Sequence, residues 1–339
     1  MIEKYRKQVY WALQKYSSYT AWAALSDTYA EFAKAYEYAI EHSGETDEET
    51  NEWDRGHLKR VLDGQIAFEK GLPRLREGQR SVFRNRSTGY LRQAAMAIVF
   101  IDRIMDPQEF DFDWMKNKEE VVDAANELSL KSRGLILTTE LDEDEERAAL
   151  ICGVEFDDLY APFNYPPQLP DVPAPTDTTR NTSEEISITG IWEPEWEIPA
   201  GLLKTLTGTA PKVEKGCMNY LLTGSIAPKY QDGPGVKFFD VRWRLIWADH
   251  RYEDGIIPET EKEYLLETQP QPASPSGRLR GLPSEIVPQT GWWHTPALKG
   301  AQGFRYFEQG QRFPETRTTD YGGVIWNYDP DQQKDPPQK

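Results

Sequence analysis

The chain has 339 residues, of which 56 are acidic and 39 are Lys or Arg, and its net charge is −17. This acidic balance argues against a general nucleic-acid binder, because neutralising phosphates requires clustered basic side chains. No apolar run approaches the roughly 18–20 residues of a membrane helix, and the first residues lack the apolar core of a signal peptide. We therefore expect a cytoplasmic protein whose partner is neither nucleic acid nor membrane.

The chain has two cysteines, Cys152 and Cys217. So few cysteines exclude a disulfide framework and favour a reducing compartment. Aromatic residues make up 12% of the chain and include 11 tryptophans, which is more buried-type surface than a disordered chain carries. The composition thus predicts a folded protein, and the length predicts two domains.

Residues 1–158 carry helical spacing. Apolar positions three or four residues apart predict four helices, over residues 22–40, 58–69, 91–101 and 118–131, and a fifth that begins at residue 142. Gly71 and Pro73 are expected to end the second helix, and Thr88 is expected to cap the third. Asp142 suits the start of the fifth helix because a carboxylate favours the positive end of the helix dipole. The pattern predicts a helical bundle.

Six prolines lie between residues 160 and 180, where no helix can continue. Residues 159–182 are therefore predicted to form an extended, proline-rich linker. The linker separates the predicted helical domain from the rest of the chain.

Beyond the linker the spacing changes to the alternation of strands. Val241, Trp243, Leu245 and Trp247 define one face of a strand expected over residues 236–247. Other strands are expected over residues 185–192, 216–222, 304–307 and 323–328. The predicted fold class is α+β, with a β-rich, loop-rich domain over residues 183–330 and a polar tail over residues 331–339.

Two short segments of the C-terminal half are similar to each other. Residues 189–194 read TGIWEP, and residues 290–296 read TGWWHTP. The similarity predicts two strand-plus-turn units that pack beside each other. Two copies of so short a string, one of them a residue longer, do not establish a repeat fold.

Motifs that carry catalysis are missing from the sequence. There is no phosphate-binding glycine loop, no Gly-x-Ser-x-Gly elbow and no Cys-x-x-Cys pair, and the four histidines share no metal-ligand spacing. Cys217 with His250 or His294 is an alternative as a thiol nucleophile and base. A small buried side chain in a strand is the preferred interpretation of Cys217. We predict no catalytic residue, no metal and no cofactor.

Charged residues are concentrated in three segments. An acidic block contains Asp142, Glu143, Asp144, Glu145 and Glu146, and a second over residues 45–54 contains Glu48 and Glu49. Each block is either a solvated loop and helix start or a docking face for a basic protein. A basic segment over residues 74–92 is interpreted as part of an intramolecular ion network rather than an RNA-binding site.

Seven of the eleven tryptophans lie between Trp192 and Trp326. Exposed tryptophans on a β-scaffold stack against sugars, so a carbohydrate- or ligand-binding module is the alternative function. Core packing is favoured, because Trp243 and Trp247 alternate as a buried face does. Burial of Trp192, Trp196, Trp292 and Trp293 cannot be read from the pattern.

Several unusual strings occur in order in the C-terminal half. They are GCMNYL at 216–221, WRLIW at 243–247, DHRYEDG at 249–255, GWWHTPA at 291–297, RYFEQG at 305–310 and DYGGVIWNYD at 320–329. Through these strings, residues 190–330 resemble bacterial immunity proteins of polymorphic-toxin and type VI secretion systems, in particular families seventy-one and seventy-two. The helical half fits those families only loosely.

The resemblance implies a protein without enzymatic activity that binds and neutralises one cognate toxin in the cytoplasm. Such a toxin, a nuclease for example, is often basic, so an acidic surface would occlude it through charge complementarity, with aromatic anchors at the centre. An enzyme with an unrecognised site is a third possibility. The predicted toxin-binding residues are Asp142, Glu143, Asp144, Glu145, Glu146, Glu48, Glu49, Trp292 and Trp293. The sequence does not indicate the oligomeric state.

Overall fold

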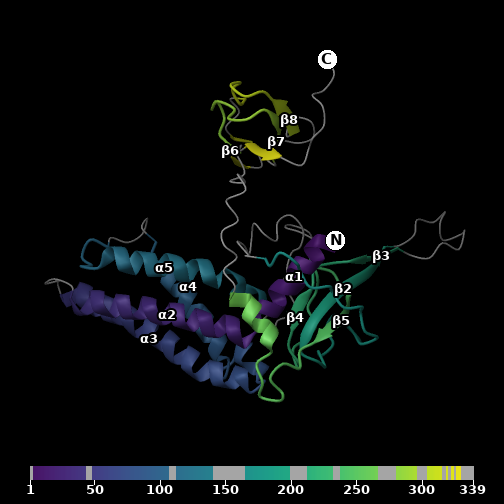
Figure 1. Cartoon of the computed structure of the whole chain (residues 1–339), viewed down its shortest axis with the longest axis horizontal. Coiled ribbons are helices and arrows are strands. Elements are labelled where there is room, and N and C mark those ends of the chain that lie inside the picture. Colours follow the sequence, from purple (N-terminus) through teal and green to yellow (C-terminus); the bar gives the residue numbers. More distant parts are fainter. Residues whose placement is uncertain are drawn as a thin grey trace, which may run out of the picture. The chain divides into compact units, whose positions relative to one another are not determined.

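A computed structural model describes eleven segments of the chain: residues 3–42, 48–106, 112–139, 165–198, 212–231, 237–265, 280–295, 304–314, 318–319, 322–323 and 326–329. The chain divides into two compact units, Met1–Leu266 and Glu267–Lys339. Figure 1 shows the elements of both units, and each unit is described by itself.

The first unit begins with helices. They are α1 (Glu3–Tyr16), α2 (Tyr19–Glu41), α3 (Glu48–Arg76), the 3-10 helix η1 (Arg80–Phe83), α4 (Tyr90–Ile104), α5 (Lys118–Ser132), the 3-10 turn η2 (Arg133–Leu135) and α6 (Ile136–Thr139). The predicted apolar faces of α2, α4 and α5 are buried, for example at Trp22, Ile98 and Leu128. The prediction for the fifth helix, from residue 142, lies outside the described residues.

Two predicted helix ends are wrong. Helix α3 continues through Pro73 to Arg76. A proline near the end of a helix removes one backbone hydrogen bond, and the fully buried Leu75 holds the last turn in place. Helix α4 has Gly89 rather than Thr88 at its N-cap. A side chain at Gly89 would meet the Arg84 carbonyl oxygen at 1.7 Å, so only glycine fits this close approach.

A five-stranded antiparallel sheet completes the first unit. Its strands are β1 (Thr179–Asn181), β2 (Gly190–Ile198), β3 (Lys212–Lys215), β4 (Asn219–Leu221) and β5 (Arg242–Ala248). Their order is β1-β5-β2-β3, with β4 also paired to β2. Strand β2 begins later than predicted, at Gly190, because Glu185 makes only an isolated bridge to Ile226. The α+β fold class is confirmed.

Helices and sheet of this unit share one hydrophobic core, which extends from Val9 to Tyr252. The division of the chain therefore differs from the predicted domains: residues 158 and 183 are not boundaries between compact units, and the predicted β-rich domain is divided at Leu266. The described part of the predicted linker, from residue 165, packs on this core through Tyr165, Leu169 and Val172.

The second unit contains a smaller antiparallel sheet. Its strands are β6 (Arg280–Gly281), β7 (Gly291–His294), β8 (Phe304–Phe307) and β11 (Trp326–Asp329), in the order β6-β11-β7-β8, and β9 (Thr318–Thr319) pairs separately with β10 (Gly322–Gly323). A separate cluster of buried side chains forms its core: Val287, Trp293, Phe307, Phe313 and Trp326. The predicted tail, residues 331–339, lies outside the described residues.

The second sheet repeats the first. The order β6-β11-β7-β8 corresponds to β1-β5-β2-β4 of the first unit, and all of these neighbours are antiparallel in both. The cross-strand register is the same at three pairs, although β2 and β5 have a register shift between Ile191 and Trp192 that β7 and β11 lack. The matching pairs are Gly190–Leu221 with Gly291–Phe307, Trp192–Asn219 with Trp293–Arg305, and Arg180–Trp243 with Gly281–Trp326.

Local hydrogen bonds repeat as well. A serine with φ of 71° lies before β2 and before β7, at Ser183 and Ser284. The glutamate after each serine accepts a hydrogen bond from the backbone N–H three residues before it, at 2.7 Å in the first sheet and 2.8 Å in the second. Trp192 and Trp293 each donate the indole N–H to the carbonyl four residues earlier. The two similar strings in the sequence are thus part of a structural repeat.

Candidate functional site

A corner between α1 and α2 brings the helices against the end of β5. The chain turns at Ser17 and Ser18, both fully buried. The Ser18 hydroxyl caps α2 by accepting a hydrogen bond from the Ala21 N–H at 3.2 Å, and the Ser17 hydroxyl donates to the Leu13 carbonyl at 2.6 Å. The corner therefore satisfies its own polar groups and can be buried against the sheet.

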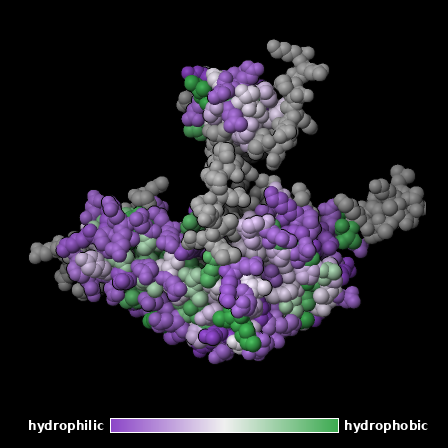
Figure 2. All heavy atoms as spheres, in the orientation of Figure 1, coloured by the Kyte–Doolittle hydropathy of each residue, from purple (hydrophilic) through white to green (hydrophobic). Residues whose placement is uncertain are grey.

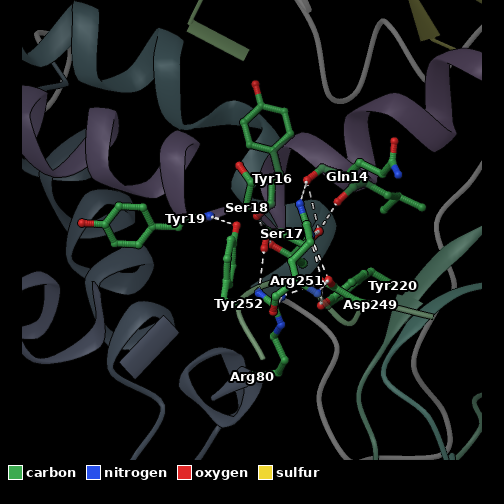
Figure 3. A network of polar contacts seen from close by, with 12 residues as sticks. Gln14, Tyr16, Ser17, Ser18, Tyr19, Arg80, Tyr220, Asp249, Arg251 and Tyr252 are labelled. Atoms are coloured by element: carbon green, nitrogen blue, oxygen red, sulfur yellow. Dashed lines mark hydrogen bonds and ion pairs between the residues drawn. The ribbon is translucent and has the colours of Figure 1, made fainter. Parts of the chain in front are cut away.

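Asp249, one residue after β5, is the centre of a buried polar network (Figure 3). Its carboxylate accepts hydrogen bonds from Arg80 at 2.9 Å, from Arg251 at 2.7 and 2.8 Å, and from the Tyr220 hydroxyl at 2.7 Å. Burial favours a raised pKa of Asp249, but the hydrogen bonds and positive charges of Arg251 and Arg80 lower it below its usual value. Asp249 is therefore ionised at neutral pH.

Arg251 has an acceptor for every N–H group of its guanidinium. They are the Asp249 carboxylate, the Gln14 carbonyl, the Ser17 hydroxyl and the Glu261 carboxylate. Desolvation opposes its charge, yet the hydrogen bond to Asp249 raises the pKa of Arg251 above its usual value. Arg251 therefore has no donor left for an external ligand, and its role is to hold the helix corner to the sheet.

A second buried carboxylate extends the network to the 3-10 helix η3 (Glu259–Leu265). Glu261 is fully buried and accepts hydrogen bonds from the Tyr252 hydroxyl and from the Thr20 N–H at 3.1 Å. The Tyr252 hydroxyl in turn accepts from the Tyr19 N–H at 2.6 Å. Residues more than 230 positions apart are joined in this way.

A cavity of about 820 Å³ lies beside the network. Three aromatic side chains line it, Trp11 of α1, Trp247 of β5 and Tyr264 of η3, and the proline-rich residues 166–171 form one wall. Trp11 also makes edge contacts with Tyr165 and Tyr264, with ring centroids 5.4 and 6.1 Å apart. The volume of the cavity is within the roughly 300–1,000 Å³ typical of small-ligand sites.

The structure describes only some of the predicted site residues. Residues 142–146 lie outside the described residues. Glu48 and Glu49 begin α3, and their side chains also lie outside them. Trp292 is half-buried with an edge contact to Tyr306 at 5.6 Å. Trp293 is fully buried in the core of the second unit, so it cannot act as an exposed anchor.

The structure also shows whether the other tryptophans are buried or exposed. Trp192, Trp243 and Trp326 are fully buried, and Trp196 is half-buried with its ring 5.3 Å from that of Tyr230. Fully buried indoles cannot stack on a sugar. The exposed tryptophan row that the carbohydrate-binding alternative requires is therefore not formed by these residues.

Cys217 is fully buried, as expected, but it is disulfide-bonded. Bonding at Cys217 does not amount to the disulfide framework that the cysteine count excluded, but a bonded sulfur cannot act as a thiol nucleophile. His250 is exposed, and its Nδ1 lies 2.8 Å from the Glu253 carboxylate, within hydrogen-bond distance. Among the described residues, no group of three or more His, Cys, Asp or Glu side chains is arranged to hold a metal ion.

Sequence reasoning found only part of the network. Arg80 belongs to the basic segment that was interpreted as an intramolecular ion network, and its ion pair with Asp249 confirms that interpretation. Asp249, Arg251 and Glu261 were missed as a set. The signal was present in the string DHRYEDG, where four charged residues directly follow a strand of buried aromatic residues.

The face of the molecule in Figure 2 is mainly hydrophilic, with small hydrophobic groups between the hydrophilic residues. None of the helices in the described segments combines the length and apolar character needed to span a bilayer.

Comparison with protein families gives two matches. Residues 2–130 match the model of Immunity protein 71, and residues 172–265 match that of Immunity protein 72. Together they cover about two thirds of the chain, include the helical half that fitted only loosely by motif, and stop before the second sheet. The polar network joins the two matched segments, since Arg80 lies in the first and Asp249 in the second.

Neither the curated proteins nor the solved structures gave a significant match to the chain. The family matches, which agree with the resemblance seen in the motifs, are therefore the basis of the assignment. Two segments of the chain, residues 2–130 and 172–265, thus match immunity protein families, which are typically non-enzymatic inhibitors.

Proposed function

We propose that this protein binds and neutralises one cognate antibacterial toxin that is delivered by a type VI or related secretion system and acts in the cytoplasm. The two family matches carry the proposal, because immunity proteins bind their cognate toxins. The inhibition is non-covalent: the protein occludes the active site of a basic toxin, such as a nuclease, with an acidic surface.

The distribution of charge supports an acidic surface on the first unit. Residues 267–339 contain eight acidic and eight basic residues, so the net charge of −17 belongs entirely to Met1–Leu266. Such a field steers a basic partner and raises its association rate, in a manner that salt weakens. The proposed contact residues are the acidic block 142–146 together with Glu48 and Glu49, and half-buried Trp292 is the proposed aromatic contact of the second unit.

Co-expression tests this function. The toxin domain encoded beside this gene is induced in a sensitive bacterium, with and without this protein. We expect survival only when the protein is present, and we expect the two chains to co-purify. Death in both cultures, with the protein expressed and folded, would contradict the pairing.

A second arm tests where the toxin acts. Both chains are produced either without an export signal or with one that sends them to the periplasm. This arm is needed because a disulfide bond, as at Cys217, is more common in oxidising compartments than in the cytosol. We expect toxicity and protection in the cytoplasmic arm. Toxicity and protection in the periplasmic arm alone would contradict cytoplasmic action.

A further inference from the structure

We propose that the cavity beside the polar network binds an arginine side chain that the toxin presents. The inference rests on the proposed function for the identity of the partner, while the chemistry of the cavity rests on the residues that line it.

The walls of the cavity suit the flat face and apolar stem of arginine. Trp11, Trp247 and Tyr264 supply aromatic faces, which attract guanidinium groups through cation–π contact and stacking. Two contacts within the chain already have this chemistry. The Arg251 guanidinium carbon lies 5.0 Å from the ring centre of Trp247, and the Lys15 ammonium lies 5.1 Å from that of Trp11. The prolines and Leu169 of the opposite wall suit the methylene stem.

The charges of the cavity favour a cation over an anion. Arg251 is the single cation among the lining residues. The Asp249 carboxylate balances its charge, and every N–H group of its guanidinium already has an acceptor. Asp171 is paired with Lys7. Glu261 lies at the buried wall, where its carboxylate already accepts hydrogen bonds from Tyr252, Thr20 and Arg251. Glu263 is exposed on η3 and is the carboxylate left for an entering cation. The guanidinium of Arg251 has no free donor for an anion, whereas an entering guanidinium would find the exposed carboxylate of Glu263.

Arginine fits this combination better than lysine. Its planar guanidinium stacks on aromatic rings and is weakly hydrated, so it loses less on entering an apolar cavity than an ammonium does. A neutral sugar would also stack and could donate a hydroxyl to Glu263, but it would not form an ion pair with that carboxylate. Binding of an oligosaccharide in place of arginine is therefore a distinct outcome of the test.

The direct test uses the full chain and small probes. N-acetyl-arginine amide is titrated and followed by ligand-observed NMR, beside the citrulline analogue, which has the same shape without the charge, and a maltooligosaccharide. We expect the arginine probe to bind and the citrulline probe to bind at least about tenfold more weakly. Equal binding of the two probes, binding of the sugar alone, or no binding of the arginine probe would overturn the proposal.

Substitutions on η3 test whether the arginine probe binds in the cavity. Thr260→Trp fills the cavity from an exposed position and should abolish binding of the arginine probe. Glu263→Lys should weaken it about fivefold, the upper end for one exposed charge. Glu259→Lys is the matched control, because Glu259 is an exposed acid of the same helix that pairs with Lys262 outside the cavity. Glu263→Gln provides a milder change, and unfolding midpoints establish that each variant is folded.

The same variants separate this inference from the proposed function. We expect Thr260→Trp and Glu263→Lys, but not Glu259→Lys, to bind the toxin more weakly. If the unaltered chain protects cells and Thr260→Trp binds the toxin equally well, the cavity proposal is wrong and the proposed function stands. If the chain binds the arginine probe but neither binds the toxin nor protects cells, the proposed function is wrong and the preference of the cavity for arginine stands.

Discussion

The two sheets of this protein share the order of four strands, the register at matched pairs and the buried tryptophan positions, but their cores are completed in different ways. The first sheet shares a core with helices α1–α6 and is joined to them by a buried ionic network. The described residues of the second unit contain strands and loops, and a small aromatic cluster around Trp293, Phe313 and Trp326 forms its core. In the cluster the rings of Phe313 and Trp326 stack 6.0 Å apart.

The comparison separates features that both sheets share from features found only in the first sheet. The positive-φ serine, the glutamate that accepts from the turn, and the tryptophan on each inner strand occur in both copies. The network of Arg80, Asp249 and Arg251 occurs only where helices cover the sheet, among the described residues. We infer that the shared features specify the sheet, whereas the network specifies how the helices dock on it.

The largest expected effect comes from removing a large buried side chain from the core of the second unit. Trp293→Ala should cost about 3–5 kcal/mol, as for other large aromatic side chains in cores. A unit of about 70 residues has little stability to spare, so the second unit should unfold at 25 °C. Hydrogen exchange followed by mass spectrometry should show lost protection in residues 280–329 alone.

The matched variant in the first sheet is Trp192→Ala. A similar loss of stability should lower the unfolding midpoint of the first unit without unfolding it, because that unit has the larger core. Loss of protection throughout the chain with Trp293→Ala would show that the second unit is required for the folding of the first.

Removing the charge at the centre of the network should have the next largest effect. Asp249→Asn leaves the buried Arg80 and Arg251 without their anion and should destabilise the first unit by about 3 kcal/mol. Urea unfolding followed by tryptophan fluorescence measures this change. Asp171→Asn, which removes the exposed partner of Lys7, is the control and should change the stability by less than about 1 kcal/mol. Equal effects would contradict a docking role for the network.

Lys15 gives the first unit a distinctive pH dependence. Burial lowers the pKa of Lys15 from 10.5 to about 8. Between these values the unfolded chain binds the proton and the folded chain does not, so the stability should rise as pH increases from about 8 to about 10. At pH 7 both states are protonated and the buried charge is a penalty, so Lys15→Met should stabilise the unit by about 2 kcal/mol and flatten this rise. Chemical unfolding at pH 7, 8, 9 and 10 measures the free energy of unfolding of both proteins. An equal rise of that free energy with pH in the variant would contradict the assignment of the rise to Lys15.

The smallest expected effect concerns the shared turn. Ser183 and Ser284 both have φ of 71°, where glycine is favoured over residues with a β-carbon. Replacing either by glycine should change the stability by less than about 1 kcal/mol, and by a similar amount in the two units. Thermal unfolding of Ser183→Gly and Ser284→Gly compares the two, and a large loss in one alone would show that the turns are not equivalent.

The sequence predicted the elements whose signal is local. The apolar spacing in α2, α4 and α5 and the strand at residues 304–307 were found because each is specified by neighbouring residues. Helix α1 was not singled out, since its buried face combines Gln8, Tyr10 and Trp11 rather than a clean aliphatic stripe. The predicted boundary near residue 158 failed because a shared core depends on contacts between segments that local patterns do not report.

By itself, the sequence determined the positions of the main helices, the absence of common catalytic motifs, the acidic charge and the resemblance to immunity proteins. Only the tertiary structure decided that Trp293 is buried, that Arg80 reaches Asp249 across 169 positions, and that the second sheet repeats the register of the first. The physical reason is that periodicity and charge act over a few residues along the chain. Burial, ion pairing and strand register depend on which distant residues meet when the core forms.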